Sequence, residues 1–346
     1  MNARGRVLAA SGGVVAIFLC IQLGALALVD PLKAGGNQFV ENTSDPTNSL
    51  VYVALILVAT GAMLAVIKLG AEWLLRGFVI FSGVYIAWYV FQVVAPGVYV
   101  TVGGVAVNVL AVALALGLGA ALYFYPEWYV VDAAGVVMGV GAAGLFGINF
   151  GILPALLLLV VLAVYDAISV YGTEHMLTLA SGVMDLRIPV VLVVPMTLSY
   201  SFLADDLPDP GAENSEDAAA ADGGAQAPET AEDSEGGDGE ETGRDRDALF
   251  IGLGDAVIPT VLVASAGFFL SGVPTLPVPG LALTLPAATA MVGTFLGLVV
   301  LLRMVLAGRA HAGLPLLNGG AIGGYLVGAL ASGLSLTQAL GLSGLL

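Results

Sequence analysis

Long apolar stretches recur along this chain, and they constrain its fold more than any other feature. Nine of them have the roughly 20 residues that a helix needs to cross the hydrocarbon core of a bilayer. They cover approximately residues 7–29, 49–69, 74–95, 98–122, 128–148, 152–172, 248–271, 280–302 and 315–335. With 58% hydrophobic and 10% charged residues, the chain falls outside the range of soluble globular proteins. We therefore predict an all-α polytopic membrane protein with nine transmembrane helices.

The basic residues predict the orientation of these helices. Short cytoplasmic loops of membrane proteins carry an excess of Lys and Arg. If the N-terminus is cytoplasmic, nine of the ten basic residues fall on the cytoplasmic side, and only Lys33 falls outside. An odd number of crossings then places the C-terminus outside. We predict a multi-pass protein of the cell membrane, with its N-terminus and residues 174–247 in the cytoplasm.

A polar segment divides the chain into parts. Residues 204–248 contain 16 of the 26 acidic residues, a composition typical of a disordered linker. The preceding residues 188–203 are apolar, but they form a short stretch that Pro189 and Pro195 interrupt. We expect them to be half-buried or extended beside the sixth helix. The predicted parts are a six-helix membrane portion (1–173), a cytoplasmic loop (174–247) and a three-helix membrane portion (248–346).

Two aspartates lie inside apolar stretches, Asp166 in VLAVYDAISV and Asp255 in LFIGLGDAVIPT. A carboxylate at the centre of a membrane helix costs roughly 2.5–3.5 kcal/mol, so such an acid indicates a function by default. Each lies about 9–10 Å from the cytoplasmic end of its predicted helix, at 1.5 Å per residue. The sixth and seventh helices are antiparallel and consecutive, so they can bring the two carboxylates face to face.

Two carboxylates held together away from water do not readily both ionise, because like charges repel. One stays protonated while the other is charged. The charged group can take a proton from water, and the protonated group can polarise a scissile carbonyl and then protonate the leaving amine. This division of roles suits peptide hydrolysis, although neither aspartate can be assigned to one role. Paired membrane carboxylates also relay protons, so a proton-coupled transporter or an ion channel is the alternative function.

The residues around both aspartates are similar to those of a known family. Tyr165-Asp166 and Gly252-Leu253-Gly254-Asp255 resemble the YD and GxGD motifs of the presenilin and signal peptide peptidase family of intramembrane aspartyl proteases. The likeness is greatest to the archaeal presenilin homologues and spans about residues 150–335. It implies nine helices, catalytic aspartates on the sixth and seventh, and a Pro-Ala-Leu motif at the start of the ninth. Here that motif reads Pro315-Leu316-Leu317.

We therefore expect an intramembrane aspartyl endopeptidase that cuts transmembrane segments of other proteins, with Asp166 and Asp255 as catalytic residues. A helical substrate must unwind to expose its carbonyls, and residues 188–203 or the Pro315 region can pair with it as a strand. We expect contact with membrane lipids but no metal, organic cofactor or nucleic acid, and a homo-oligomer is left open. The predicted substrate-binding residues are Tyr165, Gly252, Leu253, Gly254, Pro315, Leu316 and Leu317.

Three further features concern packing. Gly252 and Gly254 indicate close approach by another helix or by an extended substrate, because glycine costs about 1 kcal/mol in a helix interior. Glycines spaced by four residues at 320, 324 and 328 predict that the ninth helix packs tightly against the aspartate pair. Asp132, near the start of the fifth helix, is interpreted as a structural acid at the membrane boundary that can snorkel or pair with water.

Overall fold

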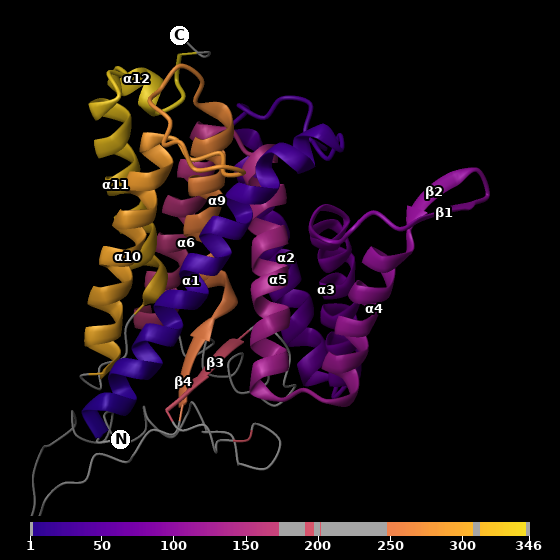
Figure 1. Cartoon of the computed structure of the whole chain (residues 1–346). Helices are drawn as coiled ribbons and strands as arrows, with labels where there is room; N and C mark the ends of the chain where they lie inside the picture. The colour runs from indigo at the N-terminus through magenta and orange to yellow at the C-terminus, as the bar shows by residue number, and fades with distance from the viewer. Residues whose placement is uncertain (1–2, 173–190, 197–200, 202–247, 307–311, 344–346) are drawn as a thin grey trace, which may run out of the picture.

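Each predicted apolar stretch contains a helix in the part of the chain that the structure, a computed structural model, describes: residues 3–172, 191–196, 201, 248–306 and 312–343. The helices lie side by side as a bundle, with the start of the chain at one end and the C-terminus at the other (Figure 1). They are α1 (Ala3–Ala34), α2 (Thr47–Lys68), α3 (Glu72–Val94), α4 (Val109–Phe124), α5 (Trp128–Asn149), α6 (Ile152–Gly172), α9 (Leu253–Phe269), α10 (Leu285–Leu306) and α11 (Gly313–Ala331).

The lengths of the helices agree with a membrane protein. Seven helices among the described residues are long and apolar enough to cross a bilayer. The other two, α4 and α9, have 16 and 17 residues. Helices suit this setting because their backbone groups bond internally and need no water. The predicted helical membrane architecture is confirmed, while the count of nine crossings stays a prediction.

Two predicted helices begin later than expected, because their apolar stretches start with strands. Residues expected to open the fourth helix form the hairpin β1 (Tyr99–Val102) and β2 (Val105–Asn108). Its two-residue turn is Gly103-Gly104, with φ of 59° and 86°, the left-handed conformation that such turns require. Residues expected to open the seventh helix form β4 (Ala248–Gly252). Periodicity alone does not distinguish a short apolar strand from a helix.

Strand β4 pairs with β3 (Val191–Pro195) in an antiparallel sheet, with Val191 opposite Gly252 and Pro195 opposite Ala248. The extended conformation expected within 188–203 is confirmed for these five residues. The sheet packs mainly against α5, not beside the sixth helix as predicted. Val193 and Ala248 share a small core with Leu122 of α4 and Val131 of α5, and the rest of the predicted cytoplasmic loop lies largely outside the described residues.

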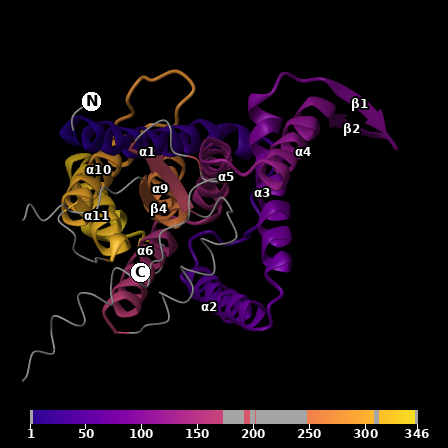
Figure 2. The same ribbon diagram turned by 90° about the horizontal axis from the view of Figure 1, so that it is seen from below.

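The tightest helix contact joins α10 and α11. A Cβ atom added at Gly320 would collide with the backbone of Gly293, and one at Gly324 with the backbone of Thr289. The predicted close contact of the glycines at 320, 324 and 328 is therefore confirmed, but its partner is α10 rather than the helices of the aspartate pair. Helices α1, α5, α9, α10 and α11 form a packed group, and α2, α3 and α4 lie to one side of it (Figure 2).

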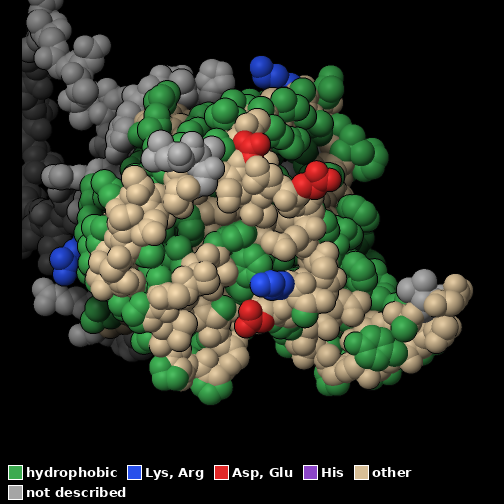
Figure 3. All heavy atoms as spheres, turned by 90° about the horizontal axis from the view of Figure 1, so that it is seen from above, with side chains coloured by type: hydrophobic (Ala, Val, Ile, Leu, Met, Phe, Trp, Pro, Cys, Tyr) green, Lys and Arg blue, Asp and Glu red, His purple; other side chains and the backbone are tan. Residues whose placement is uncertain are grey.

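A short helix near the C-terminus, α12 (Leu336–Ala339), closes the other end of the bundle. Ser335 and Gln338 form a capping box at its start, a signature that the sequence carries. Tyr325 of α11 is fully buried and donates a hydrogen bond to the Ala339 carbonyl, 2.7 Å. On this face the charged side chains are scattered among hydrophobic and neutral ones (Figure 3).

Candidate active site

Asp166 lies near the end of α6 and faces the start of α11. Its side chain is half-buried, and Oδ2 accepts a hydrogen bond from the backbone N–H of Leu314, 3.0 Å. Leu314 is the second residue of α11, and the first N–H groups of a helix have no partner within it. A carboxylate is well suited to this place, because the positive end of the helix dipole attracts a negative charge.

Asp255 lies at the same place but belongs to a later helix, α9. It is the third residue of α9, directly after the junction with β4, and is half-buried. A Cβ atom added at Gly313 would lie 3.1 Å from its Oδ2, so glycine lets the start of α11 approach this carboxylate. Both carboxylates lie against the first two residues of α11. The structure therefore brings Asp166, Asp255 and residues 313–314 together.

The position of Asp255 in its helix differs from the expected one. It lies in the first turn of α9 rather than two turns inside, because residues 248–252 are a strand. Gly252 is extended, with φ −60° and ψ 133°, so the glycines mark a strand-to-helix junction and not a helix interior. Pro259, one turn after Asp255, has no N–H to donate to the Asp255 carbonyl.

The predicted substrate-binding residues beside the aspartates differ in exposure. Gly254 is exposed, and nothing lies within 4 Å of the place where its Cβ would be. Tyr165 is 39% exposed. Leu253 instead packs against the main core, with a side-chain carbon near Gly139 of α5. Open space therefore lies on the Gly254 side of the junction.

The residues of the third motif occupy the first turn and a half of α11. Pro315 and Leu316 are half-buried, while Leu317 is fully buried in the main core. Leu316 also lines an apolar groove of about 510 Å³ between α10 and α11. Residues 313–317 thus run from the aspartates into the packed group of helices.

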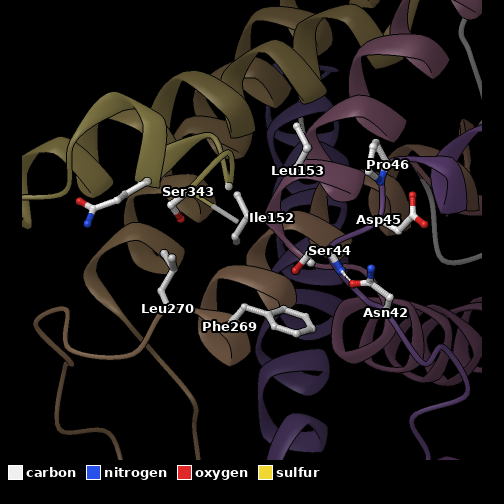
Figure 4. Close-up of a pocket in the computed structure, with 12 residues that line it drawn as sticks. Asn42, Ser44, Asp45, Pro46, Ile152, Leu153, Phe269, Leu270 and Ser343 are labelled. Carbon is white, nitrogen blue, oxygen red and sulfur yellow. Dashed lines mark hydrogen bonds between the residues drawn. The ribbon is translucent and has the colours of Figure 1, made fainter. Parts of the chain in front are cut away.

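A cavity of about 590 Å³ lies at the opposite end of the bundle. Asn42, Asp45 and Pro46 line it from the chain before α2, and Phe269 and Leu270 from the end of α9 (Figure 4). The length of α9 separates Phe269 from Asp255 by about 21 Å. This cavity contains none of the predicted site residues and is no part of the candidate active site.

Sequence reasoning missed two contributions to the site. The contacts of Leu314 and Gly313 involve backbone, which no side-chain motif identifies. The weak signal was Pro315, two residues after Gly313, since proline is tolerated in the first turn of a helix. Strand β4 was also missed, although Gly252 and Gly254 interrupt the helical pattern at its end.

Comparisons with known proteins relate the chain to one family. Residues 15–334 match the family described as "Signal-peptide peptidase, presenilin aspartyl protease". Two similar crystal structures are each described as a presenilin family intramembrane aspartate protease, in C222 and P2 space groups. The first is 30% identical, covers 93% of this chain and 99% of its own, and has a TM-score of 0.59. The second is 31% identical, covers 92% and 97%, and has a TM-score of 0.57. No curated protein matches the chain.

Proposed function

The chain belongs to the signal-peptide peptidase and presenilin family of aspartyl proteases, and on this premise we propose that Asp166 and Asp255 are its catalytic pair. The protein is a multi-pass intramembrane aspartyl protease, and the family and its structural neighbours favour this function over a proton-coupled transporter. One observation gives the strongest support for this pair. Carboxylates from two separate helices meet at the same two residues of α11, one accepting from Leu314 and the other lying against Gly313.

In the proposed mechanism the two aspartates share the work of peptide hydrolysis. The ionised carboxylate takes a proton from a water molecule, which attacks the scissile carbonyl carbon. The protonated carboxyl group donates a hydrogen bond to the carbonyl oxygen and then gives a proton to the leaving nitrogen. The Leu314 N–H fixes the orientation of Asp166, and the rigid start of α11 holds both groups in place. Which aspartate begins protonated is a property of the pair.

We propose that the substrate enters on the open side of the junction. The family acts on transmembrane substrates, and such a helix must unwind before its carbonyls can be attacked. In the described part of the chain, β4 pairs only with β3, so its second edge can accept an extended segment. A segment added there runs toward Asp255 and over the open face of Gly254.

The remaining predicted residues have different proposed roles. Tyr165, Gly252, Pro315 and Leu316 border the path of the substrate, since they are exposed or half-buried beside the aspartates. Leu253 and Leu317 support that border from the core, because their side chains pack inward.

The proposed orientation places the sheet end of the bundle in the cytoplasm. Arg6 at the start of α1, Lys68 at the end of α2, Arg76 at the start of α3 and Arg303 at the end of α10 lie toward that end. Lys33 lies at the end of α1 and therefore on the other side. An excess of basic residues is typical of cytoplasmic ends. The catalytic pair then acts near the cytoplasmic side of the membrane.

Cleavage of a single-span reporter peptide by the purified protein tests the proposed pair. Products are mapped by mass spectrometry for wild type, Asp166→Asn and Asp255→Asn. We expect cuts within the span for wild type and none for either variant. Asp45→Asn is the matched control, because Asp45 lies at the opposite end of the bundle and asparagine can also accept the Thr47 N–H bond. Cuts that persist in either active-site variant would show that another group performs the hydrolysis.

A further inference from the structure

A third membrane aspartate, Asp132, binds the sheet that precedes Asp255. It lies five residues into α5 and is only 9% exposed, so it does not pair with water as predicted, while the predicted structural role agrees with the contact that it makes. Its Oδ1 accepts a hydrogen bond from the backbone N–H of Val193 in β3, 2.7 Å. A buried carboxylate is costly unless it has such a partner. Helix α5 therefore binds β3 through a hydrogen bond within an apolar region.

The geometry of the strand pair shows which edge Asp132 holds. Val193 lies opposite Phe250 in the antiparallel register. In such a ladder the N–H and C=O groups of one residue point to the same edge. Because the Val193 N–H points to Asp132, that edge of β3 faces α5 and its other edge faces β4. Asp132 thus anchors the outer edge of a two-stranded sheet.

Strand β4 transmits this anchoring to the catalytic pair. It ends at Gly252, and Asp255 follows three residues later with no intervening loop. Displacement of β3 would therefore displace β4 and the junction that carries the Asp255 carboxylate. Misplacement of a reacting group by about 1 Å can cost about a hundredfold in rate.

A second acid, the residue just before α5, binds the chain beyond β3. Glu127 precedes α5 and is 8% exposed, and its Oε1 accepts a hydrogen bond from the hydroxyl of Ser201, 2.8 Å. The start of α5 therefore binds this chain segment at two points, residues 193 and 201. Apolar contacts of Val193 and Ala248 with Val131 complete the attachment.

We propose that Asp132 is a positioning residue for the protease: its carboxylate fixes β3, and through the β3–β4 pair it fixes the junction that places Asp255. This inference rests on the proposed catalytic role of Asp255. Asp132 does not touch the reacting groups. It acts through the hydrogen-bond acceptor that it offers, not through its charge.

The test compares Asp132→Leu, which removes the acceptor, with Asp132→Asn, which retains one. We expect kcat on the reporter peptide to fall at least about tenfold in Asp132→Leu, since a buried N–H without a partner is strongly unfavourable. KM should rise by a smaller factor than kcat falls, because only part of the proposed substrate path lies along β4. Asp132→Asn should restore kcat to within about threefold of wild type, because a neutral acceptor makes a somewhat weaker hydrogen bond.

Asn149→Leu is the matched control. Asn149 is a buried polar residue of the same helix that accepts from the backbone N–H of Val40 at the opposite end. Loss of the Asn149 hydrogen bonds should lower the melting temperature without lowering kcat. Hydrogen–deuterium exchange of residues 191–196 and 248–255 supplies a second readout, and it should accelerate in Asp132→Leu but not in Asp132→Asn or Asn149→Leu.

Two results would overturn the inference: wild-type kcat in Asp132→Leu, or equal losses in Asp132→Leu and Asp132→Asn. If Asp132→Leu does not fold, Val193→Pro removes the donor instead, and a strand edge tolerates proline where the N–H is outside the ladder. Its kcat should also fall, and wild-type kcat would again contradict the inference. A wild-type protein that cuts no reporter would instead count against the proposed function itself.

Discussion

Helices α2 and α11 are both long and apolar, but they are packed in opposite ways. Along the 22 residues of α2, all of them described, only Ser49 is buried. Helix α11 instead meets α10 with backbone against backbone, through Gly320 and Gly324. Both are apolar enough to cross a membrane, with a mean hydropathy of 2.7 in α2 and 1.4 in α11, so apolar character alone does not predict tight packing. Their small residues distinguish them, because glycines placed on one face allow such a close approach.

This difference bears on function because α6 lies between the two helices. It contacts α11 strongly and α2 more weakly, and it carries Asp166. One side of α6 is therefore fixed by the packed group, while the other faces a helix that is attached chiefly near its N-terminal end. We infer that α11 sets the geometry of the site and that α2 contributes little to it.

Adding one methyl group at the α10–α11 contact should have the largest effect on stability. In Gly324→Ala the new Cβ falls on the backbone of Thr289, and overpacking of this kind costs about 1–3 kcal/mol. The melting temperature in detergent should fall, and cleavage should fall with it because the start of α11 shifts.

Gly323→Ala is the control for this change. It lies on the same helix, but nothing is within 4 Å of its Cβ position, and alanine favours helix by up to about 1 kcal/mol. Equal destabilisation by both variants would show that the backbone contact does not distinguish α11 from other helices.

Gly254→Ala should lower activity without lowering stability. Its Cβ position is empty, so the fold should tolerate alanine there. If the substrate occupies that space, kcat/KM should fall about tenfold, a loss of about 1.4 kcal/mol in transition-state stabilisation. Parallel measurement of melting temperature and cleavage checks this, and unchanged cleavage would mean that the substrate passes elsewhere.

The smallest effect on stability is expected from the hydrogen bond that joins the start of α2 to α6. The Ser49 hydroxyl donates to the Pro154 carbonyl, 2.6 Å, so Ser49→Ala should cost about 1 kcal/mol. Hydrogen exchange near the start of α2 should accelerate while kcat stays unchanged. Thr60→Ala is the control, because that hydroxyl bonds within its own helix to Ile56 and is exposed. A large loss of kcat in Ser49→Ala would show that α2 also sets the site geometry.

The sequence predicted the helices and the meeting of the aspartates because long apolar runs and charged residues within them have few physical solutions. It did not predict where α4 and α9 begin, since five apolar residues fit a strand as well as a helix. The partner of the glycines in α11 and the anchor at Asp132 depend on which elements become neighbours in space. The backbone contacts of Leu314 and Gly313 leave no pattern in side-chain type.

The most direct test of the account is a comparison of kcat for wild type, Asp166→Asn, Asp255→Asn and the double variant on one reporter span. Residues that act as one unit give strongly non-additive losses. If Asp166 and Asp255 form one catalytic pair, each single variant is as inactive as the double variant. Independent losses that multiply in the double variant, or substantial activity in either single variant, would contradict the claim that Asp166 and Asp255 form one catalytic pair.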